Sequence, residues 1–291
     1  MERRNLTTVA VLSDAVTICE FNGMKIVRVL HNEAEAGISL HGGHLIWYRP
    51  ADEAGVIWLS EKAEFDPAKA IRGGIPVCWP WFGKTATPSH GFARISEWSL
   101  LEHRENENGV IVALSLEDSD DTRAIWPHKF RNILTFEIGR SLKVSLTSTN
   151  TDDSPWNYAG ALHSYFQIQD IRCTQITGMG TDFLDSTKGN EADSTAEPLT
   201  FEGEVDRVYV RPQATITIDD NAARQLLVTN HGHNAAVIWN PWQALSEAMG
   251  DMADNSYETM VCVESTIHSD QTITLAPGES HTLSTEVRVS R

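Results

Sequence analysis

The 291-residue chain has few basic residues and no long apolar run. Its 23 Lys and Arg stand against 40 Asp and Glu, and the formal charge of −17 repels nucleic acid and anionic membrane surfaces. No stretch approaches the roughly 20 apolar residues that cross a bilayer, and residues 1–5 do not begin a signal peptide. We therefore expect a cytoplasmic protein without a nucleic-acid or membrane partner, and a monomer as the default.

Cysteine and the common cofactor motifs are scarce as well. The chain has no CxxC pair, no Walker A sequence, no GxGxxG after a strand, no GxSxG elbow and no HExxH. The chain therefore contains none of the common nucleotide-binding or metalloprotease motifs. The four cysteines are widely spaced, and three of them have apolar neighbours, which indicates buried, reduced thiols. They are Cys19, Cys78, Cys173 and Cys262.

Alternation of apolar and polar residues with a period of two dominates the chain. It predicts half-buried strands of antiparallel sheets at residues 110–116, 133–138, 142–147 and 215–218. Turn-forming residues separate such strands at 108–109, 139–140, 219–221 and 276–278. Short helices are expected near 61–69 and within 241–252. The pattern predicts an all-β fold, one large antiparallel β-sandwich with few short helices, in which residues 1–291 form a single domain.

The segment from residue 71 to residue 98 is rich in glycine, proline and aromatic side chains. Arg72, His90 and Arg94 lie in this segment, and no acidic residue precedes Glu97. Glycine lets a backbone approach a ligand closely, and arginine presents a planar fork that suits phosphate or carboxylate. The composition indicates a site for a small, hydroxyl-rich anion. The alternative is an irregular loop whose aromatic rings close the end of a sheet.

Other polar residues lie in mostly apolar surroundings. His163 belongs to a strand-like run, where a lone histidine is more often structural than catalytic. Glu264 ends an apolar strand, so its carboxylate must reach water or be hydrogen-bonded, and both a structural and a functional role fit. Asp206 belongs to a run of alternating charges that a solvated strand face would explain. Residues 249–252 form a turn-rich loop, which is either a plain surface connection or the lining of a cleft.

Two histidine pairs raise the question of a metal site. His41 and His44 are three residues apart, and His231 and His233 are two apart. A structural zinc site usually has four protein ligands, and a catalytic one has three and a water. No Cys or His residues with suitable spacing accompany either pair, so we expect no metal site.

Several longer motifs occur together in a characteristic order. They are Arg72-Gly73-Gly74-Ile75-Pro76, His90-Gly91-Phe92-Ala93-Arg94, His163-Ser164-Tyr165-Phe166, Asp206-Arg207-Val208-Tyr209, Trp239-Asn240-Pro241-Trp242 and Val261-Cys262-Val263-Glu264. In this order the chain resembles the hexose-6-phosphate mutarotases of the galactose mutarotase-like (aldose 1-epimerase) superfamily. The resemblance runs from about residue 25 to about residue 285, and the acidic, insert-like segment 187–198 is the part that is not matched to it.

The resemblance implies a supersandwich with an open sugar cleft over one sheet. It implies cofactor-independent interconversion of the α and β anomers of hexose 6-phosphates, with a sugar phosphate as the substrate. His163 would be the general acid and Glu264 the general base. The substrate ligands would be Arg72, His90 and Asp206, with Arg94 helping Arg72 to hold the phosphate.

This assignment agrees with the chemistry of ring opening. An acid protonates the ring oxygen, a base takes the proton of the C1 hydroxyl, and the two roles reverse when the ring closes. Since the unperturbed pKa of histidine is about 6.5, modest stabilisation of its cation would keep His163 protonated near neutral pH. Glu264 would then begin the reaction as the ionised base.

Three other functions are compatible with parts of the pattern. A glycosidase would need two carboxylates about 5–10 Å apart, and Asp206 could be the second beside Glu264. A non-catalytic carbohydrate-binding protein would need neither His163 nor Glu264. A mutarotase for unphosphorylated aldoses would need no Arg94.

Overall fold

The computed structural model describes residues 6–221 and 224–291, so the amino-terminal residues 1–5 considered above lie outside the described part. Within it the chain folds mainly as antiparallel β-sheet, which confirms the predicted class. The first sheet, here called the amino-terminal sheet, has the order β1-β2-β3-β4-β5. Its strands are β1 (Thr7–Val11), β2 (Val16–Phe21), β3 (Met24–Leu30), β4 (Ala34–Ser39) and β5 (His44–Pro50).

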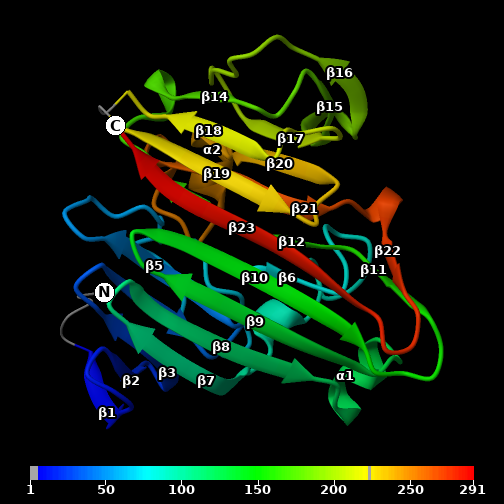
Figure 1. The fold of residues 1–291 in the computed structure, drawn as a ribbon. Coiled ribbons are helices and arrows are strands. Elements are labelled where there is room, and N and C mark those ends of the chain that lie inside the picture. The colour runs from blue at the N-terminus through cyan, green and yellow to red at the C-terminus, as the bar shows by residue number, and fades with distance from the viewer. Residues whose placement is uncertain (1–5, 222–223) are drawn as a thin grey trace.

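The second sheet, the long-strand sheet, has the order β14-β18-β19-β23-β10-β9-β8-β7. Figure 1 shows its longest strands side by side across the front of the molecule. Its members are β14 (Gln175–Thr177), β18 (Thr215–Asp219), β19 (Gln225–His231), β23 (Ser280–Ser290), β10 (Ser141–Asn150), β9 (Phe130–Ile138), β8 (Gly109–Glu117) and β7 (Ser99–Asn106).

The third sheet, the site sheet, has the order β16-β15-β17-β20-β21-β12-β6, and β13 also pairs with β21. Its members are β16 (Glu191–Ser194), β15 (Asp182–Asp185), β17 (Val205–Tyr209), β20 (Ala235–Asn240), β21 (Met260–Ile267), β12 (Gly160–Leu162), β6 (Val77–Cys78) and β13 (Tyr165–Gln167). A separate pair consists of β11 (Trp156–Tyr158) and β22 (Ile273–Leu275). Residues 187–198, which were not matched to the family motifs, include β16 at the edge of this sheet.

The alternation in the sequence corresponds to burial in the sheets. In β9 and β10, alternate side chains are buried, among them Phe136 and Val144, which are register partners. A shift of one residue would turn every buried side chain of a strand to the opposite face, so burial fixes the register. The predicted strands at 110–116, 133–138, 142–147 and 215–218 are confirmed as parts of β8, β9, β10 and β18, and the predicted turns at 108–109 and 139–140 join neighbouring strands.

Two apolar clusters cover the two faces of the site sheet. The main core extends along the chain from Ala15 to Val287 and includes Ile238 and Val263 of the site sheet. A second cluster lies on the other face and contains Trp58, Tyr165, Val208, Val237, Trp239 and Cys262. This second face of the site sheet therefore has apolar side chains that pack outside the main core.

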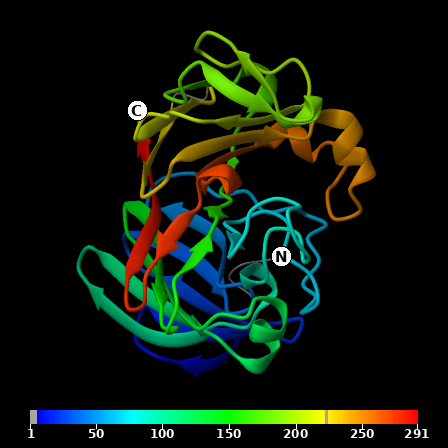
Figure 2. The ribbon, with the colours of Figure 1, turned by 90° about the vertical axis from the view of Figure 1, so that its right-hand side faces the viewer.

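The helices are few and short. They are α1 (Asp120–Ile125) and α2 (Trp242–Ala248), with the 3-10 turns η1 (Ala93–Ile95), η2 (Ile171–Cys173), η3 (Ser186–Lys188), η4 (Ser256–Thr259) and η5 (Ser269–Gln271). Figure 2 shows α2 on the side of the molecule opposite β23. No helix in the described ranges is long and apolar enough to cross a membrane.

One predicted helix is confirmed and one is wrong. The prediction within 241–252 corresponds to α2, whereas residues 61–69 form turns instead of a helix. Local side chains bind the backbone N–H groups there: Ser60 Oγ accepts from Lys62, and Asp66 Oδ1 accepts from Ala68. Bonds of this kind compete with the helical pattern, and Pro67 removes a further donor.

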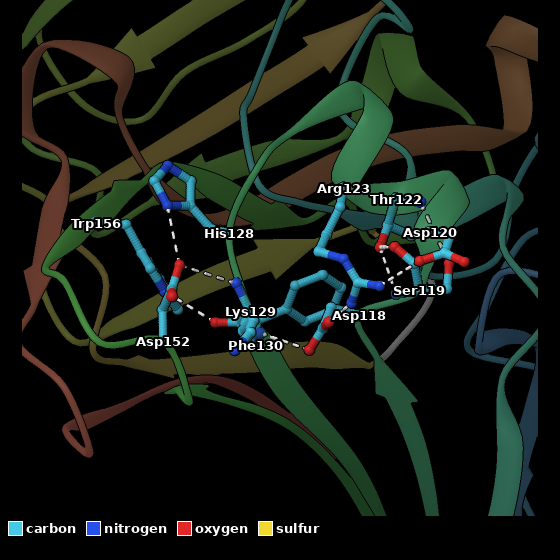
Figure 3. Close-up of polar contacts among 10 residues, drawn as sticks. All are labelled: Asp118, Ser119, Asp120, Thr122, Arg123, His128, Lys129, Phe130, Asp152 and Trp156. Carbon is cyan, nitrogen blue, oxygen red and sulfur yellow. Dashed lines mark hydrogen bonds and ion pairs between the residues drawn. The ribbon is translucent and has the colours of Figure 1, made fainter.

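The helix α1 was not predicted, and a network of polar contacts holds it in place (Figure 3). Ser119 and Thr122 form a reciprocal capping box at its start. Arg123 pairs with Asp118, whose other oxygen accepts from the N–H of Phe130 at 3.2 Å. The network therefore connects the helix to the first residue of β9.

All four cysteines are free thiols. Cys19, Cys78 and Cys262 are buried, as the apolar neighbours of most of the cysteines indicated, and Cys173 is exposed.

Candidate active site

The candidate residues gather on the face of the site sheet that is turned away from the main core. Trp239 of β20 pairs in register with Asp206 of β17 and with Cys262 of β21. Cys262 pairs in turn with Tyr165 of β13. Register partners share a face of a sheet, as do side chains two residues apart along one strand. Glu264 therefore lies on the same face as Cys262.

His163 lies between β12 and β13 and reaches Glu264 across this face. The imidazole Nε2 is 3.3 Å from Glu264 Oε1, and the exposed fractions of the two side chains are 12% and 1%. His163 Nδ1 and Glu264 Oε2 are buried and have no hydrogen-bond partner among the described residues. Buried polar atoms normally have partners, so both groups keep hydrogen-bonding capacity that a ligand could use.

The pKa values of this pair differ from the expectation. Burial lowers the pKa of His163 well below 6.5, and the nearby His90, Arg94 and Arg72 lower it further. Burial and the charge of Asp206 raise the pKa of Glu264 well above its usual range. Both shifts favour the uncharged form of each group, a neutral His163 beside a protonated Glu264, which differs from the expected protonated His163 and ionised Glu264.

Aromatic rings fix the plane of the His163 imidazole. Tyr165 stacks on it with the ring centroids 4.8 Å apart and 10° between the planes. Trp239 lies edge-on at 6.2 Å, and the ring of His90 lies at 6.0 Å. With the ring plane held, Nε2 remains directed toward Glu264.

His90 is a neutral hydrogen-bond donor in this arrangement. Burial, with a smaller contribution from the charge of Arg94, lowers its pKa to about 4. The backbone N–H of Gly83 donates to His90 Nδ1 at 3.3 Å, so the proton of the neutral ring is on Nε2. The left-handed backbone of His90, with φ of +62°, is unusual for a non-glycine residue. Such strain is common where a side chain must be directed at a ligand.

Arg72 is held on two sides. Its Nε donates to Asp251 Oδ2 at 3.0 Å, and its Nη1 donates to the hydroxyl of Tyr165 at 3.1 Å. Both side chains of the ion pair are 26% exposed. The terminal nitrogen Nη2 has no hydrogen bond among the described residues, so part of the guanidinium fork is available to a ligand.

A cavity of about 460 Å³ lies beside this guanidinium. Arg72, Arg94, Tyr165, Gly250 and Asp251 belong to its lining. Arg94 donates through Nη2 to the carbonyl of Ser89 at 2.8 Å, which fixes its side chain at the edge of the cavity. The loop at 249–252, considered above as either a surface connection or a cleft lining, therefore lines the cavity. Two arginines on one small cavity match an anionic ligand.

Asp206 is half-buried on β17, and its pKa is raised by burial first and then by the charges of Glu204 and Asp185. Its own charge acts on Glu264, as noted above. The interpretation as a plain solvated strand face is therefore wrong, because the side chain shares the face and the field of the His163–Glu264 pair.

One of the two histidine pairs supports the segment at 71–98. His41 Nε2 bonds the carbonyl of Lys69 and His44 Nε2 bonds the carbonyl of Gly73, both at 2.7 Å. Burial lowers the pKa of His44 to about 3, so its neutral ring donates to Gly73. A Cβ atom at Gly74, whose φ is +70°, would lie 2.2 Å from the carbonyl oxygen of Leu45. These contacts fix the backbone on both sides of Arg72 and Gly74.

Three residues of the site were not predicted as functional from the sequence. Asp251 and Tyr165 hold Arg72, and Cys262 lies beside the His163–Glu264 pair. Tyr165 and Cys262 stand within quoted motifs, so their positions next to His163 and Glu264 were a usable signal. Asp251 belongs to the loop 249–252 that was considered as a cleft lining, but its contact with Arg72, 179 residues away, could not be predicted.

Comparisons with known proteins identify the family of the chain. The family model described as aldose 1-epimerase matches residues 25–288. The chain belongs to the aldose 1-epimerase family. An Escherichia coli (strain K12) protein named "Putative glucose-6-phosphate 1-epimerase" is 35% identical over 98% of this chain and 97% of its own. A Cenchrus ciliaris protein of the same name is 39% identical over 84% of this chain and 78% of its own.

The fold of this aldose 1-epimerase family member is also similar to that of a solved structure. The crystal structure of "a putative mutarotase" from Salmonella typhimurium has a TM-score of 0.94 and 34% identity, and the match covers 98% of this chain and 97% of that one. The expected galactose mutarotase-like architecture is therefore confirmed.

Proposed function

We propose that the protein interconverts the α and β anomers of hexose 6-phosphates by opening and reclosing the sugar ring. The carrying observation is the contact of 3.3 Å between His163 Nε2 and Glu264 Oε1, beside a cavity that Arg72 and Arg94 line. The His163–Glu264 pair provides one proton donor and one proton acceptor for the ring-opening reaction. The two arginines provide the positive charge that binds a phosphate.

The reaction needs a proton donor at the ring oxygen O5 and an acceptor at the C1 hydroxyl. The pair supplies both, because it holds a single proton: the protonated partner donates to O5 while the other accepts the proton of O1. The C1–O5 bond breaks, the aldehyde rotates about C1–C2, and the same groups with reversed roles close the ring on the other face. Atoms and charge balance without a redox partner.

The phosphate itself would place the proton on His163. Arg72 and Arg94 both lower the pKa of His163, whereas of these two only Arg94 acts on Glu264. A bound phosphate dianion offsets the arginine charges and so raises the pKa of His163 more than that of Glu264. Substrate binding would then convert the neutral pair into the His163 acid and Glu264 base that the resemblance implied.

The remaining candidate residues have supporting roles in this proposal. The Nε2–H of the neutral His90 would donate to a sugar hydroxyl, and Asp206 would accept from one, because both lie near the pair. Arg72 and Arg94 would hold the phosphate. All these groups come from one chain, and the four cysteines are unpaired. We therefore also propose that the protein acts as a monomer in the cytoplasm.

The test is the anomerisation of glucose 6-phosphate, followed by exchange NMR or polarimetry. We expect wild-type protein to accelerate it, and His163→Ala and Glu264→Gln each to reduce the rate by at least about 100-fold, the usual scale for loss of a general acid or base. Circular dichroism confirms the folding of each variant. Near-wild-type turnover in either folded variant would refute the pair as the acid and base.

A further inference from the structure

A third potential ligand lies beside the His163–Glu264 pair. Cys262 is fully buried on β21, and the ligand atoms of Cys262, His163 and Glu264 all lie within 4.8 Å of one another. The reaction proposed above has no use for a thiol. Glu264 Oε2, with the side chain 99% buried, is without a hydrogen-bond partner in the described part of the chain.

We propose that His163, Cys262 and Glu264 form a binding site for a thiophilic divalent cation such as Zn²⁺ at the floor of the sugar cleft. Thiolate, imidazole and carboxylate are the ligands that zinc prefers, and three protein ligands leave one position open. The bond lengths of roughly 2.0–2.3 Å place tetrahedral ligand atoms about 3.3–3.7 Å apart. The His163–Glu264 separation of 3.3 Å matches this value. The Cys262 sulfur lies within 4.8 Å of both atoms and would have to come closer to complete the site.

Charge balance favours the occupied site. Zn²⁺ with one thiolate, one carboxylate and a neutral imidazole has no net charge, so burial does not oppose it as it opposes a single ion. Asp206 contributes a negative charge on the same face, whereas Arg94 and Arg72 contribute opposing positive ones. The imidazole of His163 is 12% exposed, so the site is accessible from solvent on this side.

The position has a consequence for activity, which rests on the proposed function. The cation would bind His163 Nε2 and the Glu264 carboxylate, the atoms that must exchange protons with the sugar O5 and the C1 hydroxyl. Zn²⁺ and hexose phosphate therefore exclude each other, and the cation is an inhibitor instead of a cofactor.

The direct test is titration with Co²⁺, a spectroscopic substitute for Zn²⁺, in the absence of sugar. We expect a thiolate-to-cobalt charge-transfer band in the wild type, and competition by Zn²⁺. The matched control is Cys173→Ser, which removes the exposed thiol and should keep the band. Cys262→Ser should abolish the band. It should also lower the affinity for Zn²⁺ by more than about 100-fold, the upper range for loss of a residue that only supports a metal ligand.

Two outcomes would overturn the proposal: no band in the wild type, or a band that depends on Cys173 and survives in Cys262→Ser. If Cys262→Ser does not fold, Glu264→Gln retains the thiol and nearly the same shape, and it should also lose affinity. Because this titration contains no substrate, it tests the site whether or not the protein anomerises sugars. In the activity assay, Zn²⁺ should raise the apparent KM for glucose 6-phosphate in Cys173→Ser, and an unchanged KM would refute the shared position.

Discussion

Replacement of Arg72 by Met is the most informative perturbation of the phosphate site. The change removes the guanidinium, keeps an unbranched side chain, and leaves Asp251 and the hydroxyl of Tyr165 without their partner. Asp251 is 26% exposed, so water can solvate its carboxylate and the stability should fall by no more than about 1 kcal/mol. Thermal unfolding measures this part of the effect separately.

The effect on catalysis should be large and specific for the phosphate. A hydrogen bond to a charged group contributes about 1.5–3 kcal/mol, or roughly ten- to hundredfold in affinity. We expect the KM for glucose 6-phosphate to rise by about that factor in Arg72→Met, and similarly in Arg94→Met. Weak activity on free glucose should be largely unchanged, because free glucose has no phosphate to lose.

Exchange NMR with saturating and subsaturating sugar separates KM from kcat for both substrates. Arg104→Met is a matched control, since Arg104 pairs with Glu102 on the exposed face of β7, away from the site. Equal losses on glucose 6-phosphate and glucose would mean that Arg72 contacts the ring or supports the fold. An unchanged KM for the phosphosugar would refute the assignment of the phosphate to this cavity.

Two further predictions concern metals and protons. Dialysis against EDTA should cause no loss of anomerisation, because the reaction proceeds through His163 and Glu264; a loss that Zn²⁺ or Mg²⁺ restores would contradict this. Saturating inorganic phosphate should raise the pKa of His163, measured by NMR of the imidazole, because it offsets the positive charges that lower this pKa. Arg72→Met should reduce the shift, and an equal shift in that variant would refute the coupling.

The strands could be predicted because burial on one face imposes a period of two on the residues themselves. Strands β8, β9, β10 and β18 follow the alternation directly, and the turns beside them contain the expected residues. The order of the strands within each sheet could not be predicted in this way. For example, β10 lies between β9 and β23. Its pairing with β23 joins residues more than 130 positions apart in the sequence.

The helix errors have a local cause. At 61–69 the composition allows a helix, but Ser60 and Asp66 bind nearby backbone N–H groups and hold turns instead. At α1 the sequence contains a helix-start signal but little apolar periodicity. Ser119 and Thr122 form a capping box at the start of this short helix. Capping residues decide such short elements more than periodicity does.

The candidate site was predictable at the level of residue types but not of contacts. His163, Glu264, Arg72, His90, Arg94 and Asp206 could be named from motifs, whereas the holding of Arg72 by Asp251 depends on the loop after α2. The pKa of His163 could not be predicted because its direction depends on burial and on three positive or ionisable neighbours. A sequence gives the reference pKa of a residue, and only the fold gives its surroundings.

The central claim is that the protein anomerises phosphorylated hexoses in preference to free ones. The most direct measurement compares kcat/KM for α-glucose 6-phosphate, glucose and galactose by exchange NMR under one set of conditions. The account predicts rapid interconversion of the phosphosugar, with the free sugars at least about tenfold poorer because they lack the charge-assisted bonds to the two arginines. Equal or higher kcat/KM for glucose or galactose would contradict it.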